Sequence, residues 1–439
     1  MIKKTLTTII FGLLVQTVFS QTIDKRKLDS YFQELEKNNK FMGSVALFEN
    51  GQIVYTKAVG FADIDTKSKP NENTKYRVGS ISKSFTSVLT MKAIEENKLA
   101  LDTKLKTFFP AIKNADKITI SNLLNHRSGI HNFTDDSTYL EWNTKRQSET
   151  EMIKVIENGG SDFEPNSTAK YSNSNFVLLS YILQKVYKKS YSDLLTQKIT
   201  KPLGLKSTFV GGKIDLKNNE CNSYKYAPNW VEERETDMTI PMGAGAIVST
   251  PSDLTAFAFA LFNDKIISAK SVELMKTIKD GYGFGLFQMP FGDKKSYGHT
   301  GGIDGFNSVY GYFPNEKIGF AVTSNGNNYN TNNVSIVLLS AIFNVKYDIP
   351  DFKEIDLTTE ELDKYLGCYS TKDLPIKITF TKKDKTLISQ ATGQSAFALV
   401  ATEKDKFKFD QAGVELEFNP TAKTMILRQR GRTFTFIKE

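Results

Sequence analysis

The sequence is poor in the residues that most often build metal sites and disulfide frameworks. Its 439 residues include two cysteines and three histidines. The histidines, His126, His131 and His299, lack the spacing with carboxylates that is typical of a zinc site. Cys221 and Cys368 lie far apart and outside any dense cysteine pattern, so whether they form a disulfide stays open. We therefore expect chemistry that needs neither a metal nor another cofactor.

A concentration of charge of one sign is also missing. The 57 Lys and Arg residues exceed the 49 Asp and Glu residues by only eight. Lysines alternate with acidic residues, as in "KKDKTL" and "EKDKFKFD". Nucleic-acid-binding proteins normally gather Lys and Arg on one face. We therefore expect no nucleic-acid partner.

Apolar runs long enough to cross a membrane are lacking as well. The most apolar stretch is "LTTIIFGLLVQTVF", which follows the basic start "MIKK" and precedes Ser20. It is short for a membrane span, and this layout is typical of a secretory signal. We expect residues 1–20 to be a signal peptide. The remaining chain is then periplasmic or secreted and has no transmembrane segment.

The rest of the chain predicts two domains of different character. In residues 21–349, strand-like segments at both ends enclose a helical middle, which is typical of an α+β domain with an antiparallel sheet. In residues 350–439, short alternating runs such as "IKITF", "VELEF" and "TFTFI" are separated by turns. This second part predicts a small all-β domain. A barrel is expected, because closure removes exposed strand edges.

Local signals predict individual elements of the first domain. The apolar residues of "KLDSYFQELEKNN" share one helical face. Asn50-Gly51 between two strand-like runs predicts a hairpin. A later helix should begin with Thr250 as its cap, Pro251 as its first residue and Asp253 in its first turn.

The stretch "RVGSISKSFTSVLTMK" places a lysine three residues after a serine. This spacing occurs twice, at Ser80/Lys83 and at Ser167/Lys170, so spacing alone identifies nothing. Ser80 follows Gly79 where a helical pattern begins, and a helix start offers free N–H groups and the positive end of the helix dipole. Lys83 lies on the same face, and burial would lower its pKa toward that of a useful base. The alternative is a helix cap beside a solvated lysine.

A second motif, Tyr171-Ser172-Asn173, precedes a strongly apolar helical stretch. The Tyr171 phenol could relay a proton between a serine nucleophile and a leaving group. The Asn173 amide could hold the lysine and donate to a substrate carbonyl. A capping asparagine beside a packing tyrosine is the alternative.

A third motif, His299-Thr300-Gly301-Gly302, lies on a presumed edge strand. Glycines would let a substrate backbone approach the strand closely. The N–H of Gly302 could join that of Ser80 as an oxyanion hole. A glycine-rich hairpin is the alternative.

Together the motifs resemble a known family. In order, "GSISK", "YSN" and "HTG" match the S-x-x-K, Y-x-N and K/H-T-G elements of the serine penicillin-recognising enzymes. The chain is most similar to the class C β-lactamase and D-alanyl-D-alanine carboxypeptidase branch, also through "NLLNHRSGI", "KPLGLKST" and "GAGAIVSTPSDLTAFA". The resemblance spans about residues 25–345. It implies a β-lactamase/transpeptidase-like antiparallel sheet flanked by helices, with a helical subdomain near residues 90–200. The tail resembles the lipocalin-like domain often appended to this family.

The resemblance also implies roles for individual residues. Ser80 would be the nucleophile that forms a covalent ester, and Lys83 and Tyr171 would move protons. His126 falls in a stretch that the family uses structurally, so we expect a core or capping histidine. The substrate-binding residues that the resemblance implies are Asn173, His299, Thr300, Gly301 and Gly302.

One departure from the family pattern affects the expected substrate. His299 stands where most β-lactamases have Lys. A histidine there is similar to certain carboxypeptidases, D-amino-acid-specific peptidases and esterases, so a fixed cation for a β-lactam carboxylate is missing or pH-dependent. We expect an exported serine hydrolase acting on a peptide amide or ester, for example D-Ala-D-Ala termini. Two alternatives stay open: a β-lactamase, and a non-catalytic module that binds peptidoglycan or β-lactams.

Overall fold

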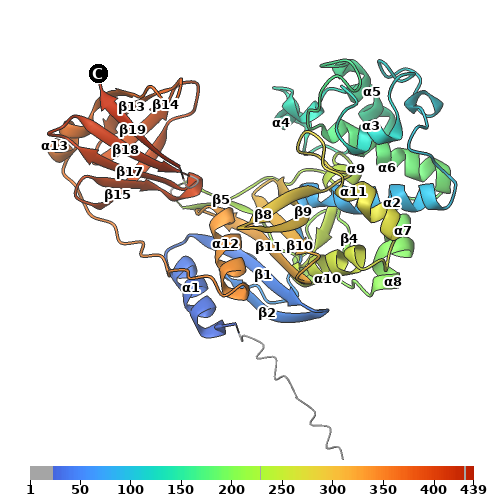
Figure 1. Cartoon of the computed structure of the whole chain (residues 1–439), viewed down its shortest axis with the longest axis horizontal. Helices are drawn as coiled ribbons and strands as arrows, with labels where there is room; N and C mark the ends of the chain where they lie inside the picture. Colours follow the sequence, from blue (N-terminus) through green and yellow to red (C-terminus); the bar gives the residue numbers. More distant parts are fainter. Residues whose placement is uncertain (1–22, 228, 430–431) are drawn as a thin grey trace, which may run out of the picture.

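The computed structural model describes residues 23–227, 229–429 and 432–439. Residues 1–20, the expected signal peptide, lie outside this part of the chain. Figure 1 shows a large body of sheet and helices, followed through an extended segment by a barrel that ends the chain. Within the described ranges, no helix has the length and apolar character needed to span a membrane.

The centre of the large body is a mainly antiparallel sheet assembled from both ends of this region, as the sequence predicts. Its strand order is β2-β1-β11-β10-β9-β8, and the short β5 joins it by a parallel pairing with β11. The hairpin β5–β6 extends the sheet beyond β11. The strands are β1 (Phe41–Glu49), β2 (Gln52–Val59), β5 (Tyr224–Tyr226), β6 (Trp230–Glu232), β8 (Phe287–Phe291), β9 (Lys294–Ile303), β10 (Phe306–Phe313) and β11 (Ile318–Asn327).

Helices cover both faces of this sheet. On one face, α1 (Lys25–Lys37) and α12 (Thr331–Ile342) pack into one apolar cluster with strand residues. The four apolar residues that predicted the inner face of α1 are all buried: Leu28, Tyr31, Phe32 and Leu35. On the other face, α2 (Ser82–Glu95) and α10 (Pro251–Phe262) form a second cluster with the sheet.

The local signals in the sequence are confirmed. Asn50 and Gly51 have φ angles of 50° and 91°, so both turn residues of the β1–β2 hairpin adopt the left-handed conformation that this turn requires. Thr250 caps α10 by accepting a hydrogen bond from the N–H of Asp253, with Pro251 as the first helical residue.

The helical subdomain lies beside the sheet, at the upper right of Figure 1. Its central helix, α6, is buried along most of its length, which explains the strongly apolar sequence. A small sheet of β3 (Tyr76–Arg77), β7 (Ile247–Ser249) and β4 (Phe209–Val210) connects the two parts. The remaining helices of the large body are α3 (Ile120–Leu124), α4 (Tyr139–Trp142), α5 (Glu149–Gly159), α6 (Asn173–Tyr187), α7 (Tyr191–Leu195), α8 (Lys201–Leu203), α9 (Met242–Gly245) and α11 (Ala269–Lys276).

The C-terminal part is a closed eight-stranded barrel, which confirms the predicted all-β tail. Its strands pair in chain order and β19 closes onto β12. Cys368 in β12 and Cys221 in the large body are both free thiols. The elements are α13 (Thr359–Leu362), β12 (Gly367–Ser370), β13 (Lys377–Lys383), β14 (Thr386–Ala391), β15 (Phe397–Glu403), β16 (Lys406–Phe409), β17 (Val414–Asn419), β18 (Thr424–Gln429) and β19 (Arg432–Lys438).

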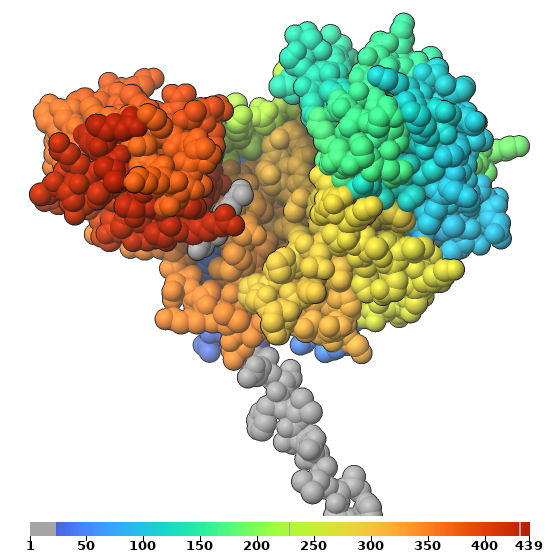
Figure 2. Space-filling view, turned by 45° about the horizontal axis from the view of Figure 1, so that its top comes forward, coloured from blue at the N-terminus to red at the C-terminus, as the bar shows by residue number. Residues whose placement is uncertain are grey.

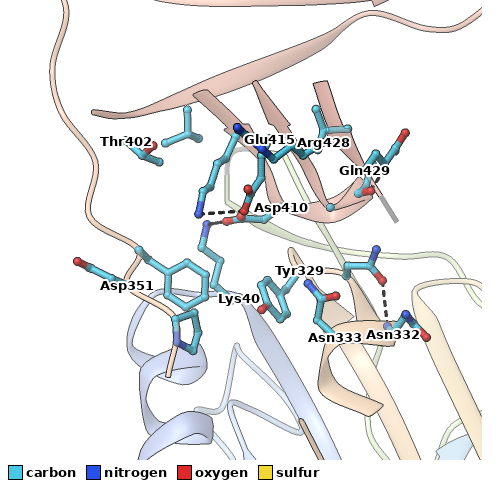
Figure 3. Close-up of a pocket in the computed structure, with 18 of the residues that line it drawn as sticks. Lys40, Tyr329, Asn332, Asn333, Asp351, Thr402, Asp410, Glu415, Arg428 and Gln429 are labelled. Atoms are coloured by element: carbon cyan, nitrogen blue, oxygen red, sulfur yellow. Dashed lines mark hydrogen bonds and ion pairs between the residues drawn. The ribbon is translucent and has the colours of Figure 1, made fainter. Parts of the chain in front are cut away.

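The barrel meets the large body at the ends of β1 and β11. Lys40 forms an ion pair with Asp410 at 2.7 Å, and both side chains are largely buried (8% and 20% exposed). Gln411 donates a hydrogen bond to the side chain of Asn328 at 2.9 Å. Beside these contacts lies a polar cavity of about 950 Å³, seen in close-up in Figure 3. Figure 2 shows a recess between the barrel (orange to red) and the helical subdomain (cyan to green).

Candidate active site

Strand β9 is paired on both sides only at Tyr297 and Gly298. Its pairing with β8 runs from Lys294 to Gly298, whereas its pairing with β10 continues to Ile303. The presumed edge strand is therefore an edge only beyond Gly298. The part of β9 that has lost its pairing with β8 carries the His-Thr-Gly-Gly motif, and it lies against the turn that holds Ser80.

Ser80 lies in a 3-10 turn, Gly79–Ile81, that leads directly into α2. Gly79 has a φ angle of 49°, and a Cβ atom added there would lie 2.8–2.9 Å from the backbone of Gly302. Only glycine combines this backbone conformation with so close an approach to β9. The turn and the strand are thus pressed together beside Ser80.

Lys83 extends from the first turn of α2 to the Ser80 hydroxyl. Its Nζ lies 2.9 Å from Ser80 Oγ, 2.7 Å from Asn173 Oδ1 and 2.7 Å from the Ala244 carbonyl oxygen. The side chain is fully buried, and this desolvation holds its pKa well below the ordinary value of 10.5. A neutral amine has two N–H donors and one lone pair. It can donate to Asn173 and Ala244 and accept the proton of Ser80.

The aromatic ring of Tyr171 lies next to the Lys83 amine. Lys83 Nζ is 4.8 Å from the centre of its ring. Burial raises the pKa of the Tyr171 phenol, so the group stays protonated. Its ring stacks on His126 with a centroid distance of 4.4 Å.

His126 is a buried, uncharged histidine, as expected. Its Nδ1 accepts a hydrogen bond from the N–H of Ser172 at 3.1 Å, just before α6 begins. Burial, with repulsion from Lys83, lowers its pKa well below the ordinary range. His126 therefore supports both the Tyr171 ring and the start of the helix that carries Asn173.

The Asn173 side chain is fixed by partners on both of its polar atoms. Its Oδ1 accepts from Lys83, and its Nδ2 donates to Thr134 Oγ1 at 3.1 Å. Its backbone N–H donates to Asn132 Oδ1 at 2.9 Å. The N-cap position of α6 belongs to Ser172, so Asn173 is not the capping residue that the alternative required.

His299 and Thr300 point to opposite sides of β9. His299 is buried, its Nδ1 lies 2.5 Å from the Thr300 carbonyl oxygen, and its ring packs on Phe287 at 4.3 Å. Burial lowers its pKa to about 3, so the ring is neutral near pH 7. Thr300 is exposed. The third motif therefore supplies no fixed positive charge.

The two glycines of this motif meet the Ser80 turn. A Cβ atom added to Gly301 would lie 3.1 Å from the backbone nitrogen of Ser80. Ser308 Oγ donates to the Val78 carbonyl oxygen at 2.8 Å and ties β10 to the same turn. Gly302 is exposed, so its N–H and that of Ser80 lie side by side where an oxyanion could be stabilised.

A cavity of about 360 Å³ opens beside Ser80. Of the predicted site residues, Ser80, Asn173 and Gly302 line it, and Lys83, Tyr171, His299, Thr300 and Gly301 do not. The cavity has both apolar and charged walls. Its main side-chain lining comprises Phe133, Thr134, Tyr139, Leu140, Asn143, Glu233, Arg234, Thr236, Pro241, Ile303 and Asp304.

One wall of the cavity is held by Arg77, which the sequence did not single out. Its guanidinium pairs with Asp304 at 2.9 Å and with Glu235 at 2.8 Å, and it donates to the Thr236 carbonyl oxygen at 3.1 Å. The Arg77 and Asp304 side chains are only 2% and 3% exposed. A single arginine in a short strand carries no motif, so only the structure identifies it.

The second Ser-x-x-Lys pair has quite different surroundings. Ser167 is exposed and donates to the Glu164 carbonyl oxygen, and Lys170 pairs with Asp162 at 2.6 Å. Neither side chain lines the cavity beside Ser80. In the described ranges, no group of three His, Cys, Asp or Glu side chains could hold a metal ion.

The family follows from a match over most of the chain. Residues 28–339 match the Beta-lactamase family. The chain belongs to this family. The expected relationship to β-lactamases and penicillin-binding proteins, and the expected serine hydrolase fold with its C-terminal barrel, are thereby confirmed.

Individual relatives extend this finding. Penicillin-binding protein 4* of Bacillus subtilis (strain 168) is 27% identical and covers 93% of this chain and 97% of its own length. Teichoic acid D-alanine hydrolase of Staphylococcus aureus is 26% identical, with coverage of 69% of this chain and 74% of the relative. A crystal structure of D-amino acid amidase from Ochrobactrum anthropi SV3, complexed with L-phenylalanine amide, has 26% identity and a TM-score of 0.64, and it covers 73% of this chain and 99% of that one.

Proposed function

We propose that this family member is an exported serine hydrolase that cleaves a peptide amide or an ester through an acyl-enzyme on Ser80. Its action would be like that of a D-alanyl-D-alanine carboxypeptidase, another peptidase or an esterase. The observation that carries the proposal is the buried Lys83, whose amine contacts Ser80 Oγ at 2.9 Å while two acceptors hold its other side. A structural lysine has no need of full burial beside the hydroxyl of a half-buried serine.

The reaction follows from these contacts. Ser80 Oγ attacks the substrate carbonyl carbon while its proton passes to Lys83, and the N–H groups of Ser80 and Gly302 stabilise the resulting oxyanion. Tyr171, which remains protonated, transfers a proton to the departing nitrogen or oxygen and regains one from Lys83. The C–N or C–O bond then breaks and leaves an ester on Ser80. Water hydrolyses this ester and restores the hydroxyl.

The comparisons support an amide or ester of a D-amino acid as the substrate class. The names of two relatives state that they act on a D-alanine-bearing teichoic acid and on D-amino acid amides. Efficient β-lactam hydrolysis is the second candidate, favoured only by the family match. The neutral His299 argues against it, because the antibiotic carboxylate would find no fixed cation there. Peptidoglycan peptides are a natural source of such substrates for an exported enzyme.

The test is mass spectrometry of the intact protein after exposure to penicillin or to small D-amino acid esters. We expect a mass increase on Ser80 that decays with time when the ester turns over. Ser80→Ala should abolish it. Ser167→Ala is the matched control, because Ser167 has the same spacing to a lysine, and this variant should acylate normally. Acylation that survives Ser80→Ala would overturn the proposal, and stable stoichiometric binding without turnover would favour a binding module.

Export is tested separately. Residues 1–20 carry the proposed signal peptide, so the exported protein should begin at Gln21. N-terminal sequencing of protein recovered from the periplasm or the medium checks this, and an intact Met1 in that material would contradict it.

A further inference from the structure

The cavity beside Ser80 is lined by only some of the predicted site residues. Gly302, Ile303 and Asp304, at the far end of β9, form part of its wall. Tyr171 and His299 do not line this cavity. In the proposed function Tyr171 protonates the leaving group, so the leaving group must lie on the Tyr171 side. The cavity therefore receives the acyl part of the substrate.

Three charged side chains line this acyl cavity: Glu233, Arg234 and Asp304. Asp304 is already neutralised, because it pairs with Arg77 at 2.9 Å and accepts from Thr236 Oγ1 at 2.6 Å. Arg234 is exposed, so water and salt screen its charge.

The Glu233 carboxylate is neither paired like that of Asp304 nor exposed like the Arg234 side chain. It is half-buried, and in the part of the chain that the structure describes its carboxylate has no ion-pair partner. The neighbouring carboxylate of Glu235 is paired with Arg77 at 2.8 Å. A half-buried carboxylate that lacks a partner is stabilised by any cation that enters the cavity.

We propose that Glu233 binds a positively charged amino group on the acyl part of the substrate. This inference rests on the proposed function and narrows its substrate class to aminoacyl esters and amides with a free α-amine. An N-acylated substrate would leave the Glu233 carboxylate desolvated without a partner, so it is disfavoured.

The leaving-group side supports the same substrate class. A carboxypeptidase must recognise the carboxylate of its departing residue, but the side chain available there is the neutral His299. The exposed Thr300 offers only a hydroxyl. A leaving group without a carboxylate, such as an alcohol or a simple amine, therefore fits this half of the site.

The experiment compares alanine methyl ester with N-acetylalanine methyl ester, each as the D and the L enantiomer. The native protein should prefer the free amine. Glu233→Gln should lower kcat/KM for the free-amine ester by about 10- to 100-fold, the range for one hydrogen bond to a charged group, mostly through KM. The N-acetyl ester should be unaffected. Glu232→Gln is the matched control, because Glu232 is the adjacent carboxylate and does not line the cavity. This variant should leave kcat/KM for both esters unchanged.

The remaining outcomes each decide a separate question. Equal or better turnover of the N-acetyl ester by the native protein would overturn the role of Glu233, as would an equal loss on both esters in Glu233→Gln. If the native protein prefers an N-succinyl ester and Arg234→Gln selectively slows the turnover of that ester, the cavity binds an anionic group. The inference would then be wrong. Acylation of Ser80 by p-nitrophenyl acetate, which has no amine, tests the proposed function alone and should be the same in every Glu233 variant.

Discussion

Burial acts on Lys83 and Tyr171 in opposite directions. It lowers the pKa of the amine and raises the pKa of the phenol, so that each group is shifted toward its uncharged form. An uncharged amine can accept a proton and an uncharged phenol can donate one. The same physical cause thus provides a base and an acid on either side of Ser80.

The pH dependence of acylation follows from these shifts. The neutral form of Lys83 is the active one, so the rate should rise once with pH, through an ionisation well below 10.5, and then stay level. Because the pKa of Tyr171 is raised, no fall should occur up to about pH 10, where an ordinary phenol ionises. Single-turnover kinetics with a neutral anilide measure this profile. A descending limb between pH 7 and 10 would contradict the assignment.

Thr134 should act on catalysis through Asn173. Its hydroxyl accepts from Asn173 Nδ2 and so keeps Oδ1 turned toward Lys83. Thr134→Val removes the acceptor and should lower kcat about tenfold or more, the effect of one lost buried hydrogen bond, with little change in KM. Thr134→Ser should restore the rate. Equal losses in both variants would mean that Thr134 serves packing rather than orientation.

At the residue scale, the sequence points to candidate reactive groups but not to the residues that support them. Ser80, Lys83 and Tyr171 were identified because three loose motifs occur in one order. Thr134 and the Ala244 carbonyl were not, because a lone threonine and a backbone oxygen carry no pattern. Their contribution depends on where distant loops bring them.

For helices and strands as well, the sequence predicts local features but not those that depend on pairing with another element. The apolar face of α1 and the start of α10 follow from local sequence rules, and both are confirmed. The point at which β9 loses its pairing with β8 was not predicted, because nothing in the sequence marks Phe287 as the first residue of β8. Beyond Gly298, β9 lies against the Ser80 turn instead.

Arg77 should stabilise the link between β3 and the end of β9. Arg77→Met leaves Asp304 buried without a cation, and such a broken pair costs about 3–5 kcal/mol of unfolding free energy. The control is Lys117→Met, whose pair with Glu164 has both side chains more than half exposed, so its loss should hardly change the unfolding free energy. Urea denaturation measures both. Similar small losses would show that Asp304 is solvated after all.

At the scale of the whole molecule, the short alternating runs beyond residue 349 predict a barrel. They do not predict how the barrel contacts the large body. Lys40 and Asp410 are 370 residues apart, and neither stands in a motif. The division of the chain at residues 349 and 350 stays a prediction. In Figure 3, the Lys40–Asp410 ion pair connects the barrel to the large body.

Asp410→Asn should loosen this docking. It leaves the largely buried Lys40 ammonium without its counter-charge, at a cost of about 1–3 kcal/mol. Adding Lys40→Met should recover much of the loss, because the unpaired charge is then removed. Glu417→Gln, which breaks an exposed pair with Arg428 within the barrel, is the control and should cost less than about 1 kcal/mol. Chemical denaturation of the full chain measures all three, and a loss that the double variant does not reduce would contradict the coupling.

Lys83 also links the chemistry at Ser80 to the folding equilibrium. Unfolding returns the amine to water and to a pKa near 10.5, so between its lowered pKa and 10.5 each unfolding molecule takes up one proton at this side chain. Between the two pKa values of Lys83, its contribution to the unfolding free energy rises by about 1.4 kcal/mol for each pH unit. Calorimetry of Lys83→Met in buffers of different ionisation enthalpy should therefore record one proton fewer taken up on unfolding, and an unchanged uptake would contradict this. Acidification thus weakens the fold through the same amine that it inactivates.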